Sequence, residues 1–109
     1  MKSLGFVEVQ SVAAAVDCLD LMCKAAAVDF VTWERKLGGR LVTVIVEGQV
    51  SDVKAAVEAT SSAIIKPAAT AIIANPHTET QRMVKLSASR LSKVKEPKDN
   101  QEDKFVQEV

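Results

Sequence analysis

The 109-residue sequence is poor in the residues from which most active sites are built. It contains one histidine, two cysteines and no tyrosine, and aromatic residues make up only 4% of it. Its 14 basic and 14 acidic residues cancel, so no net charge draws the chain to nucleic acid or to a membrane surface. No apolar run approaches the roughly 18 residues of a membrane-spanning helix, and the first six residues lack the apolar stretch of a signal peptide. We therefore expect a cytoplasmic protein with no nucleic-acid and no membrane partner.

The chemistry-bearing residues are too scattered to predict an enzyme. His77 follows Asn75-Pro76 in an expected loop, where a lone histidine usually packs or forms a hydrogen bond. No Ser/His/Asp set, paired-cysteine metal spacing or Walker-type phosphate loop is present in the sequence. Cys18 and Cys23 are separated by about 500° around a helix, so they do not share a face, and we expect two reduced packing thiols. We predict no catalytic residue, no metal and no cofactor.

Length and composition favour one small domain that gains stability by assembly. The chain is too short for two domains. Its apolar fraction is 48%, but much of this is alanine. Small side chains permit close packing and bury little area each, and burial contributes only ~25 cal/mol per Å². Association with further copies would therefore add stability that the single chain lacks.

The densest β-rich stretch is a predicted hairpin in the middle of the chain. Its strands are Val28–Glu34 and Leu41–Glu47, which are rich in β-branched and apolar residues. They flank the corner Lys36–Arg40, whose Gly38-Gly39 pair tolerates positive φ and allows a tight reversal. Backbone N–H groups between two cations also suit an anion. One alternative is therefore a small ligand- or nucleotide-binding regulatory domain that holds phosphate at this corner.

Apolar periodicity predicts two more strands and three helices. The strands are Leu4–Val9 and Thr70–Ala74. The helices run from an N-cap at Ser11 to about Ala26, from a cap at Ser51 or a neighbour to Pro67, and from a cap at Thr78 onward. In this order the elements give an α+β fold, a ferredoxin-like split β-α-β-β-α-β antiparallel sheet with two helices on one face plus a short C-terminal helix.

Each helix should bury one apolar stripe. The stripe of the first helix is Val12, Val16, Leu19, Cys23 and Ala26, that of the second is Val53, Val57, Thr60 and Ile64, and the last carries Met83, Val84, Leu86 and Leu91. Trp33 is expected in the core or an interface. From Ser92 onward nine of the eighteen residues are charged. We therefore expect a domain at residues 1–91 and a charged, disordered tail at residues 92–109.

Four segments together resemble a known family. They are Asp20–Lys24, Glu34–Gly48, Val53–Val57 and Asn75–Thr78, in this order and at these separations. The set resembles the bacterial microcompartment shell proteins, the single-domain hexamer formers of carboxysomes and metabolosomes that carry the BMC domain. The resemblance covers roughly residues 3–88. It implies a structural protein whose six copies form a flat tile with a central pore, and whose tiles join into a shell in the cytoplasm.

The resemblance also implies a pore lining. The corner of many members that faces the pore corresponds here to Lys36, Leu37, Gly38, Gly39 and Arg40. Gly39 stands where the usual serine would face the channel, and Arg40 stands where a second glycine would be. Two cations per copy at one axis would favour small polar or anionic metabolites.

The resemblance further implies an edge between tiles. Lys24, in its Asp-x-x-x-Lys setting with Asp20, matches the lysine that packs against its symmetry mate. Asn75 stands where many members have an arginine, and His77 lies in the same edge segment. The implied partners are further copies in a homohexamer, other shell proteins, and encapsulated enzymes or their targeting peptides.

Overall fold

The protein is described here by a computed structural model of residues 2–35 and 41–95. The elements in chain order are β1 (Ser3–Val9), α1 (Val12–Ala25), β2 (Asp29–Glu34), β3 (Val42–Gly48), α2 (Val50–Ala59), a single 3-10 turn η1 (Thr60–Ser62), β4 (Ala69–Ile73) and α3 (Thr78–Lys95). The predicted order of strands and helices is confirmed. Each strand bound agrees with the sequence prediction to within about one residue, which is the usual uncertainty of such bounds.

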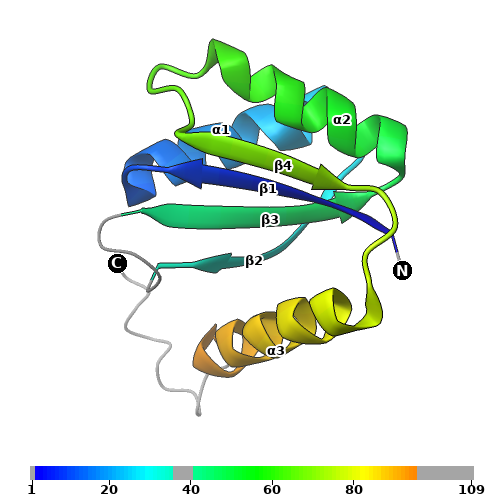
Figure 1. The fold of residues 1–109 in the computed structure, drawn as a ribbon. Helices are drawn as coiled ribbons and strands as arrows, with labels where there is room; N and C mark the ends of the chain where they lie inside the picture. The colour runs from blue at the N-terminus through cyan, green and yellow to red at the C-terminus, as the bar shows by residue number, and fades with distance from the viewer. Residues whose placement is uncertain (1, 36–40, 96–109) are drawn as a thin grey trace.

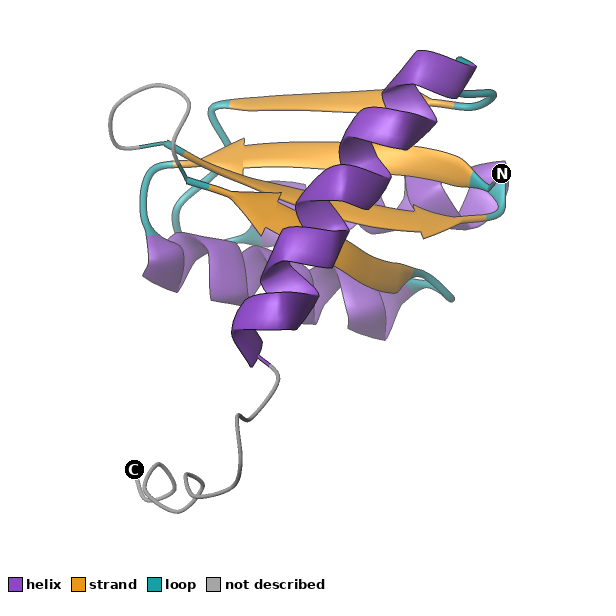
Figure 2. Cartoon of the chain, turned by 90° about the horizontal axis from the view of Figure 1, so that it is seen from below, coloured by secondary structure: helices purple, strands orange, loops and turns teal. Residues whose placement is uncertain are grey.

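The four strands form one antiparallel sheet in the order β2-β3-β1-β4. The first strand is central: it pairs with β3 from Ser3 opposite Gly48 to Val9 opposite Val42, and with β4 on its other side. Helices α1 and α2 cover one face, and α3 crosses the other (Figure 1); the view from below in Figure 2 shows α3 in front of the strands. The predicted split β-α-β-β-α-β arrangement is therefore confirmed.

The larger core lies between the sheet and the pair α1/α2. Alternate valines of β1 and β3 pack there against small side chains of the helices; the buried members are Val7, Val9, Val42, Val44, Val46, Ala14, Ala15, Cys18, Met22, Val53, Ala56 and Val57. Trp33 is half-buried against this core, as expected. Gly5 faces α2, and a Cβ at this position would lie only 2.9 Å from Cγ1 of Val53. The absence of a side chain therefore allows α2 to lie close to β1.

A smaller core lies under α3. It contains Leu4, Ile45 and Val84, with Phe6 and Val31 packed against them. Leu4 and Ile45 point away from the larger core because successive side chains of a strand alternate between the two faces. The fold thus has two apolar layers, one on each face of the sheet.

Two hydrogen bonds join the middle of α3 to β2. The Ser87 hydroxyl donates to the Glu34 carboxylate. The buried Thr32 hydroxyl lies 2.9 Å from the same Ser87 oxygen and donates to it in turn. A bulge between Phe30 and Thr32 shifts the register of β2 against β3. With Val31 as the extra residue, both Val31 and Thr32 meet the α3 side.

The start of α1 is as predicted, but its predicted buried stripe is only partly right: Leu19 and Ala26 are half-buried against the core, whereas the other three members are exposed. Ser11 is the N-cap, and its hydroxyl accepts the Ala14 N–H at 3.1 Å. Val12 is exposed, Val16 is 59% exposed, and Cys23 is exposed. The residues of α1 that are buried are Ala14, Ala15, Cys18 and Met22. Small residues let the helix axis approach the sheet, which turns the valines to the flank of the helix.

The second helix differs from the prediction at both ends. It begins at Val50 after the N-cap Gln49, so Ser51 is not the cap. It ends at Ala59, long before Pro67, because the Thr60 hydroxyl donates to the Val57 carbonyl at 2.6 Å and η1 follows. Val53, Val57 and Thr60 are buried as predicted. Ile64 lies beyond the helix and is 92% exposed.

The third helix is longer than the short helix that the sequence predicts. It spans 18 residues and continues past the expected domain boundary at Leu91 to Lys95. Its cap is His77 rather than Thr78: Nδ1 of His77 accepts the Glu79 N–H at 3.0 Å, and its carbonyl accepts the Gln81 N–H at 3.0 Å. Of the predicted apolar residues, Val84 is buried and Leu91 is half-buried, whereas Met83 and Leu86 are exposed. Residues 96–109 of the expected tail lie outside the described residues.

Candidate functional site

The strands that flank the candidate pore corner are described, although the corner is not. Lys36, Leu37, Gly38, Gly39 and Arg40 lie outside the described residues. Glu34 pairs with Thr43 at the end of the β2–β3 ladder, and Val9 pairs with Val42 at the end of the β1–β3 ladder. Strand β2 therefore ends, and β3 begins, at the end of the sheet where β1 finishes.

The candidate edge residues lie at the other end of the strands. Helix α1 runs back along the sheet after β1, which brings Lys24, in its last turn, to the end where β1 begins. Strand β4 is antiparallel to β1 and finishes at the same end, where Leu4 pairs with Ile73. Asn75 and His77 follow directly, in the loop before α3 at the right of Figure 1. The length of the strands thus separates the strand ends that flank the corner from the edge candidates.

Lys24 and Asp20 form an ion pair on the exposed side of α1. The Lys24 Nζ lies 2.8 Å from the Asp20 Oδ2, at the predicted i,i+4 spacing. The hydrogen bond to Asp20, and then the charge of this carboxylate, raise the pKa of Lys24 above its usual value. A cation in the last turn also interacts favourably with the helix dipole. The ammonium therefore stays charged and is held at the end of the helix.

The loop before α3 has its own internal bonds. His77 caps the helix through Nδ1, so the proton of the neutral imidazole is on Nε2. Gln81 Nε2 donates to the carbonyl of the buried Pro76 at 3.0 Å. Asn75 and His77 are exposed. Within residues 2–35 and 41–95, no hydrogen bond or ion pair joins this loop to Lys24, so the edge candidates share an end of the protomer without contact.

The two cysteines differ from each other. Both are free thiols, but Cys18 is buried and Cys23 is exposed. Burial, and then the charge of Asp17, raise the pKa of Cys18 above its usual value, which makes it a poor nucleophile. The prediction of a packing thiol is confirmed for Cys18 and wrong for Cys23, because the buried face of α1 lies elsewhere.

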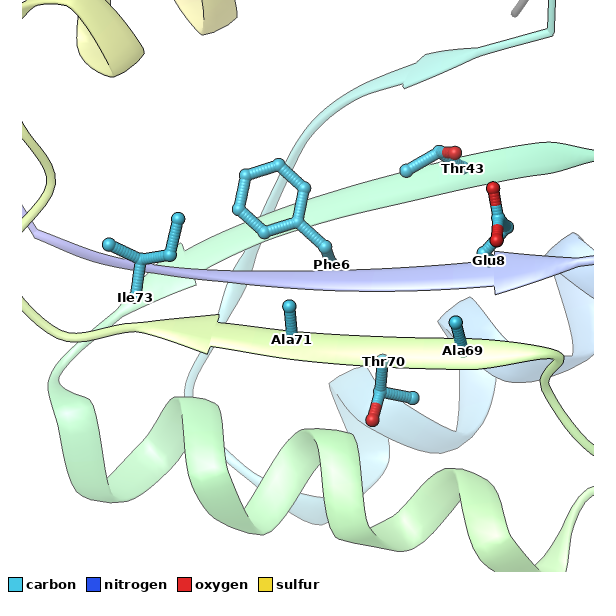
Figure 3. Close-up of a pocket in the computed structure, with 7 residues that line it drawn as sticks. All are labelled: Phe6, Glu8, Thr43, Ala69, Thr70, Ala71 and Ile73. Atoms are coloured by element: carbon cyan, nitrogen blue, oxygen red, sulfur yellow. The ribbon is translucent and has the colours of Figure 1, made fainter. Parts of the chain in front are cut away.

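Open surfaces on the α3 face are a feature that the sequence analysis does not anticipate. Figure 3 shows Phe6, Glu8 and Ala71 pointing to one side of β1 and β4, where they line a groove of about 370 Å³. A groove of about 450 Å³ adjoins it beside Met83 and Leu86 of α3. The sequence signal is the alternation of residues along Ala69–Ile73, which places every second side chain on this face.

The described parts of the chain, residues 2–35 and 41–95, contain neither a cluster of metal ligands nor a membrane-spanning helix. No three His, Cys, Asp or Glu side chains lie close enough there to hold a metal ion. No helix there has the length and apolar character to cross a membrane.

Comparison with known proteins gives consistent matches. The family model described as BMC domain matches residues 3–76. The bacterial microcompartment shell protein PduA of Citrobacter freundii is 40% identical over 86 residues, which cover 76% of this chain and 91% of PduA. The carboxysome shell protein CcmK2 of Synechocystis sp. is 41% identical over 80 residues, which cover 69% of this chain and 77% of CcmK2.

A solved structure gives the same result. A microcompartment protein from Desulfitobacterium hafniense matches with a TM-score of 0.66 and 27% identity, over 80% of this chain and 48% of that protein. The present chain thus spans about half the length of that solved protein. Helix α3 lies beyond residue 76, where the family match ends.

Proposed function

Because the chain belongs to the BMC domain family, we propose that it is a structural shell protein of a bacterial microcompartment and not an enzyme. In this proposal six copies form a ring around a central pore, and rings join edge to edge, with other shell proteins, into the shell of a compartment in the cytoplasm. The observation that carries the proposal is that the strand ends flanking Lys36–Arg40 and the edge candidates lie at opposite ends of the strands. A tile needs this arrangement, because one end of each protomer meets the axis and the other meets the next tile.

The proposed pore lining is the corner Lys36, Leu37, Gly38, Gly39 and Arg40. A cyclic ring repeats the same end of every copy around its axis. If the end where β2 passes into β3 is at that axis, two cationic residues from each copy surround the opening. Low-dielectric walls focus such a charge and raise the local concentration of anions. The pore would therefore admit small anionic or polar metabolites in preference to cations.

The proposed edge between tiles contains Asp20, Lys24, Asn75 and His77. An ammonium has three donors, and the bond to Asp20 occupies one of those of Lys24. The others remain for acceptors on a neighbouring tile. The cap bond of His77 uses Nδ1 and leaves the Nε2–H as a donor. Asn75 is shorter than arginine and uncharged, so the contact at this position should be weaker than in arginine-bearing relatives.

An apolar flank supports contact between copies within the ring. A groove of about 330 Å³ runs between α1 and the β2 edge of the sheet, lined by Val16, Leu19, Phe30, Trp33 and Leu91 among others. Open apolar surface of this kind is usually buried by association. The valine stripe of α1 that is exposed in the single chain lies partly in this groove, which is consistent with a protomer that is stable chiefly as part of an assembly.

Native mass spectrometry or sedimentation velocity tests the ring. We expect a particle of about 70 kDa, six times the 11.7 kDa of one chain. A stable monomer or dimer at micromolar concentration would contradict the proposal.

Permeation through reconstituted layers tests the pore. Arg40→Glu should lower the passage of anions relative to cations, whereas Lys54→Glu, on the exposed side of α2, should leave the ratio unchanged. Equal ratios for the wild type and Arg40→Glu would show that Arg40 does not face the channel. Screening at physiological salt acts over about 8 Å. Added salt should therefore weaken the attraction of anions outside the narrow opening more than within it.

A further inference from the structure

The third helix covers only part of its face of the sheet. It packs against β2 and crosses the sheet diagonally in Figure 2. The grooves beside it are lined by residues of β1, β3 and β4. The two grooves described above, of about 370 and 450 Å³, share Phe6 and Thr43 and are therefore continuous. We call this surface the open trough. Its floor is Phe6, Thr43 and Ala71, and its wall is Met83, Leu86 and Arg90.

Large apolar side chains line much of the open trough, together with the charged residues Glu8, Glu34 and Arg90. Met83 is 68% exposed and Leu86 is 54% exposed, although both are large apolar residues on one helix. Phe6 is only partly covered on the floor below them. A continuous apolar surface with a helix along one side has the shape to receive a second, short amphipathic segment in parallel with that helix.

We propose that the C-terminal segment Asp103–Val109 of the same copy binds in the open trough beside α3. The segment has three large apolar residues, and Val109 follows Phe105 by four positions and Val106 by three. Residues at this spacing lie on one face of a helix. As a helix the segment would therefore offer one apolar face to the trough, with charged residues on its other side.

Charge favours the same pairing. The α3 sequence, residues 78–95, carries five basic residues and one acidic residue. The following sequence, residues 96–109, carries five acidic residues and two basic residues. The helix and the segment thus have opposite net charges, whereas the complete chain is neutral. Attraction between them draws the segment toward α3 and away from the carboxylates of Glu8 and Glu34, which supplies orientation that apolar contact alone does not give.

The chain is long enough for this return. Arg90 in the wall of the trough is five residues before the end of α3, about 7.5 Å along a helix axis. The linker 96–102 has seven residues, which span up to about 23 Å when extended. Pro97 disfavours continuation of the helix and suits a reversal directly after Lys95. The segment can therefore reach the near end of the trough within its own copy.

This inference does not depend on the proposed ring. The segment and α3 both lie beyond residue 76, outside the match to the family model. A chain that failed to form hexamers could still bind its own C-terminal segment, and a hexamer could form without this contact. The two proposals therefore succeed or fail separately.

Photocrosslinking of the full chain tests the proposal. A benzoylphenylalanine replaces Phe105, and mass spectrometry identifies the crosslinked peptides in a mixture of isotopically light and heavy copies. We expect crosslinks within one copy to the strands or helix of the open trough. Crosslinks that join light to heavy copies would overturn the proposal in favour of a second copy as the occupant. A crosslink yield from position 105 that is no higher than the yield from the same probe at Asn100, in the linker, would also overturn the proposal.

A matched pair of alanine variants sharpens the test. Ala71 points into the trough, as Figure 3 shows, whereas Ala55 lies on α2, which covers the opposite face of the sheet; both residues are exposed. Ala71→Glu places a charge in the floor beside Phe6, and we expect it to lower the intramolecular crosslink yield about tenfold, which corresponds to about 1.4 kcal/mol. Ala55→Glu makes the same substitution away from the trough and should leave the yield unchanged. An equal loss in both variants, or no loss in either, would overturn the proposal.

Discussion

The close approach of α2 to β1 at Gly5 predicts a large effect from the addition of one carbon atom. In Gly5→Ala the new Cβ would lie 2.9 Å from Cγ1 of Val53, 3.1 Å from Cγ2 of Val57 and 3.3 Å from Cγ2 of Val46. All three neighbours are β-branched, so rotation about χ1 is restricted and does not relieve the contact cheaply. Either a valine leaves its preferred rotamer or α2 moves away from the sheet.

The expected cost follows from two opposing terms. Overpacking of a filled core destabilises by about 1–3 kcal/mol. Alanine in place of glycine restricts the unfolded chain, which restores about 0.4–1 kcal/mol. We therefore expect the free energy of unfolding to fall by roughly 1–2 kcal/mol. For a domain of this size the melting temperature should decrease by about 4–8 °C for each kcal/mol.

Urea denaturation gives the measurement, with the protein concentration held fixed because assembly makes stability depend on it. The sharper test is a double-mutant cycle with Val53→Ala, which alone opens a cavity and costs about 2 kcal/mol. In the double variant the methyl group that Gly5→Ala adds occupies part of that space. The two changes should then cost less together than the sum of each alone, by about 1 kcal/mol. Additive costs, or a Gly5→Ala protein as stable as the wild type, would refute this account of the packing.

Three further predictions concern single side chains. Lys24→Ala should leave soluble rings intact but abolish extended layers in electron micrographs. The pair with Asp20 raises the pKa of Lys24 in the folded protein. The stabilisation from this pair is therefore complete below the usual lysine pKa of about 10.4 and is lost as the pH rises through the folded value. Ser87→Ala should lower the free energy of unfolding by about 1–3 kcal/mol in urea titrations, because the buried Thr32 hydroxyl loses its partner. A thiol reagent should modify Cys23 rapidly in the native protein and Cys18 only after unfolding, and equal rates would contradict the burial of Cys18.

The strands could be predicted because their signal is local. β-Branched residues form short runs that glycine and proline interrupt, and Val42–Gly48 is the clearest of these. Because successive side chains alternate between the two faces of the sheet, every second side chain of a strand faces α1 and α2, and the others face the side of α3. Helix order and loop lengths complete the split arrangement. The opposite ends of the protomer at which Lys24 and the β2 and β3 residues flanking the corner lie follow from this topology alone.

The buried face of α1 could not be predicted because two stripes satisfy the same helical period. One contains Val12 and Val16, and the other contains Ala14, Ala15 and Cys18. Hydrophobicity ranks valine above alanine, but close packing of a helix on a sheet selects the smaller side chains. Only the distance between the helix and the sheet decides between the two stripes, and a single sequence does not contain it.

The polar contacts of α3 could not be predicted from the sequence. Ser87 bonds to Glu34 and Thr32, which are 53 and 55 residues away in the chain. The cap formed by His77 depends on a ring nitrogen where serine, threonine or aspartate is usual. The assignment of Lys36–Arg40 to a pore stays a prediction, since these residues lie outside the described part of the chain.

The central position of β1 determines when the sheet can be completed during synthesis. This strand is made first, yet Ser3 pairs with Gly48 and Leu4 with Ile73, so its second neighbour is the last strand of the sheet. Helix α1 can form early because its hydrogen bonds are local, whereas pairing over long separations is slow. The ribosome adds about 5–20 residues per second. The apolar side chains of β1 therefore stay without β3 and β4 beside them for several seconds after they are made. Newly made chains therefore pass through a stage that is prone to misassembly, and the emergence of β4 ends it.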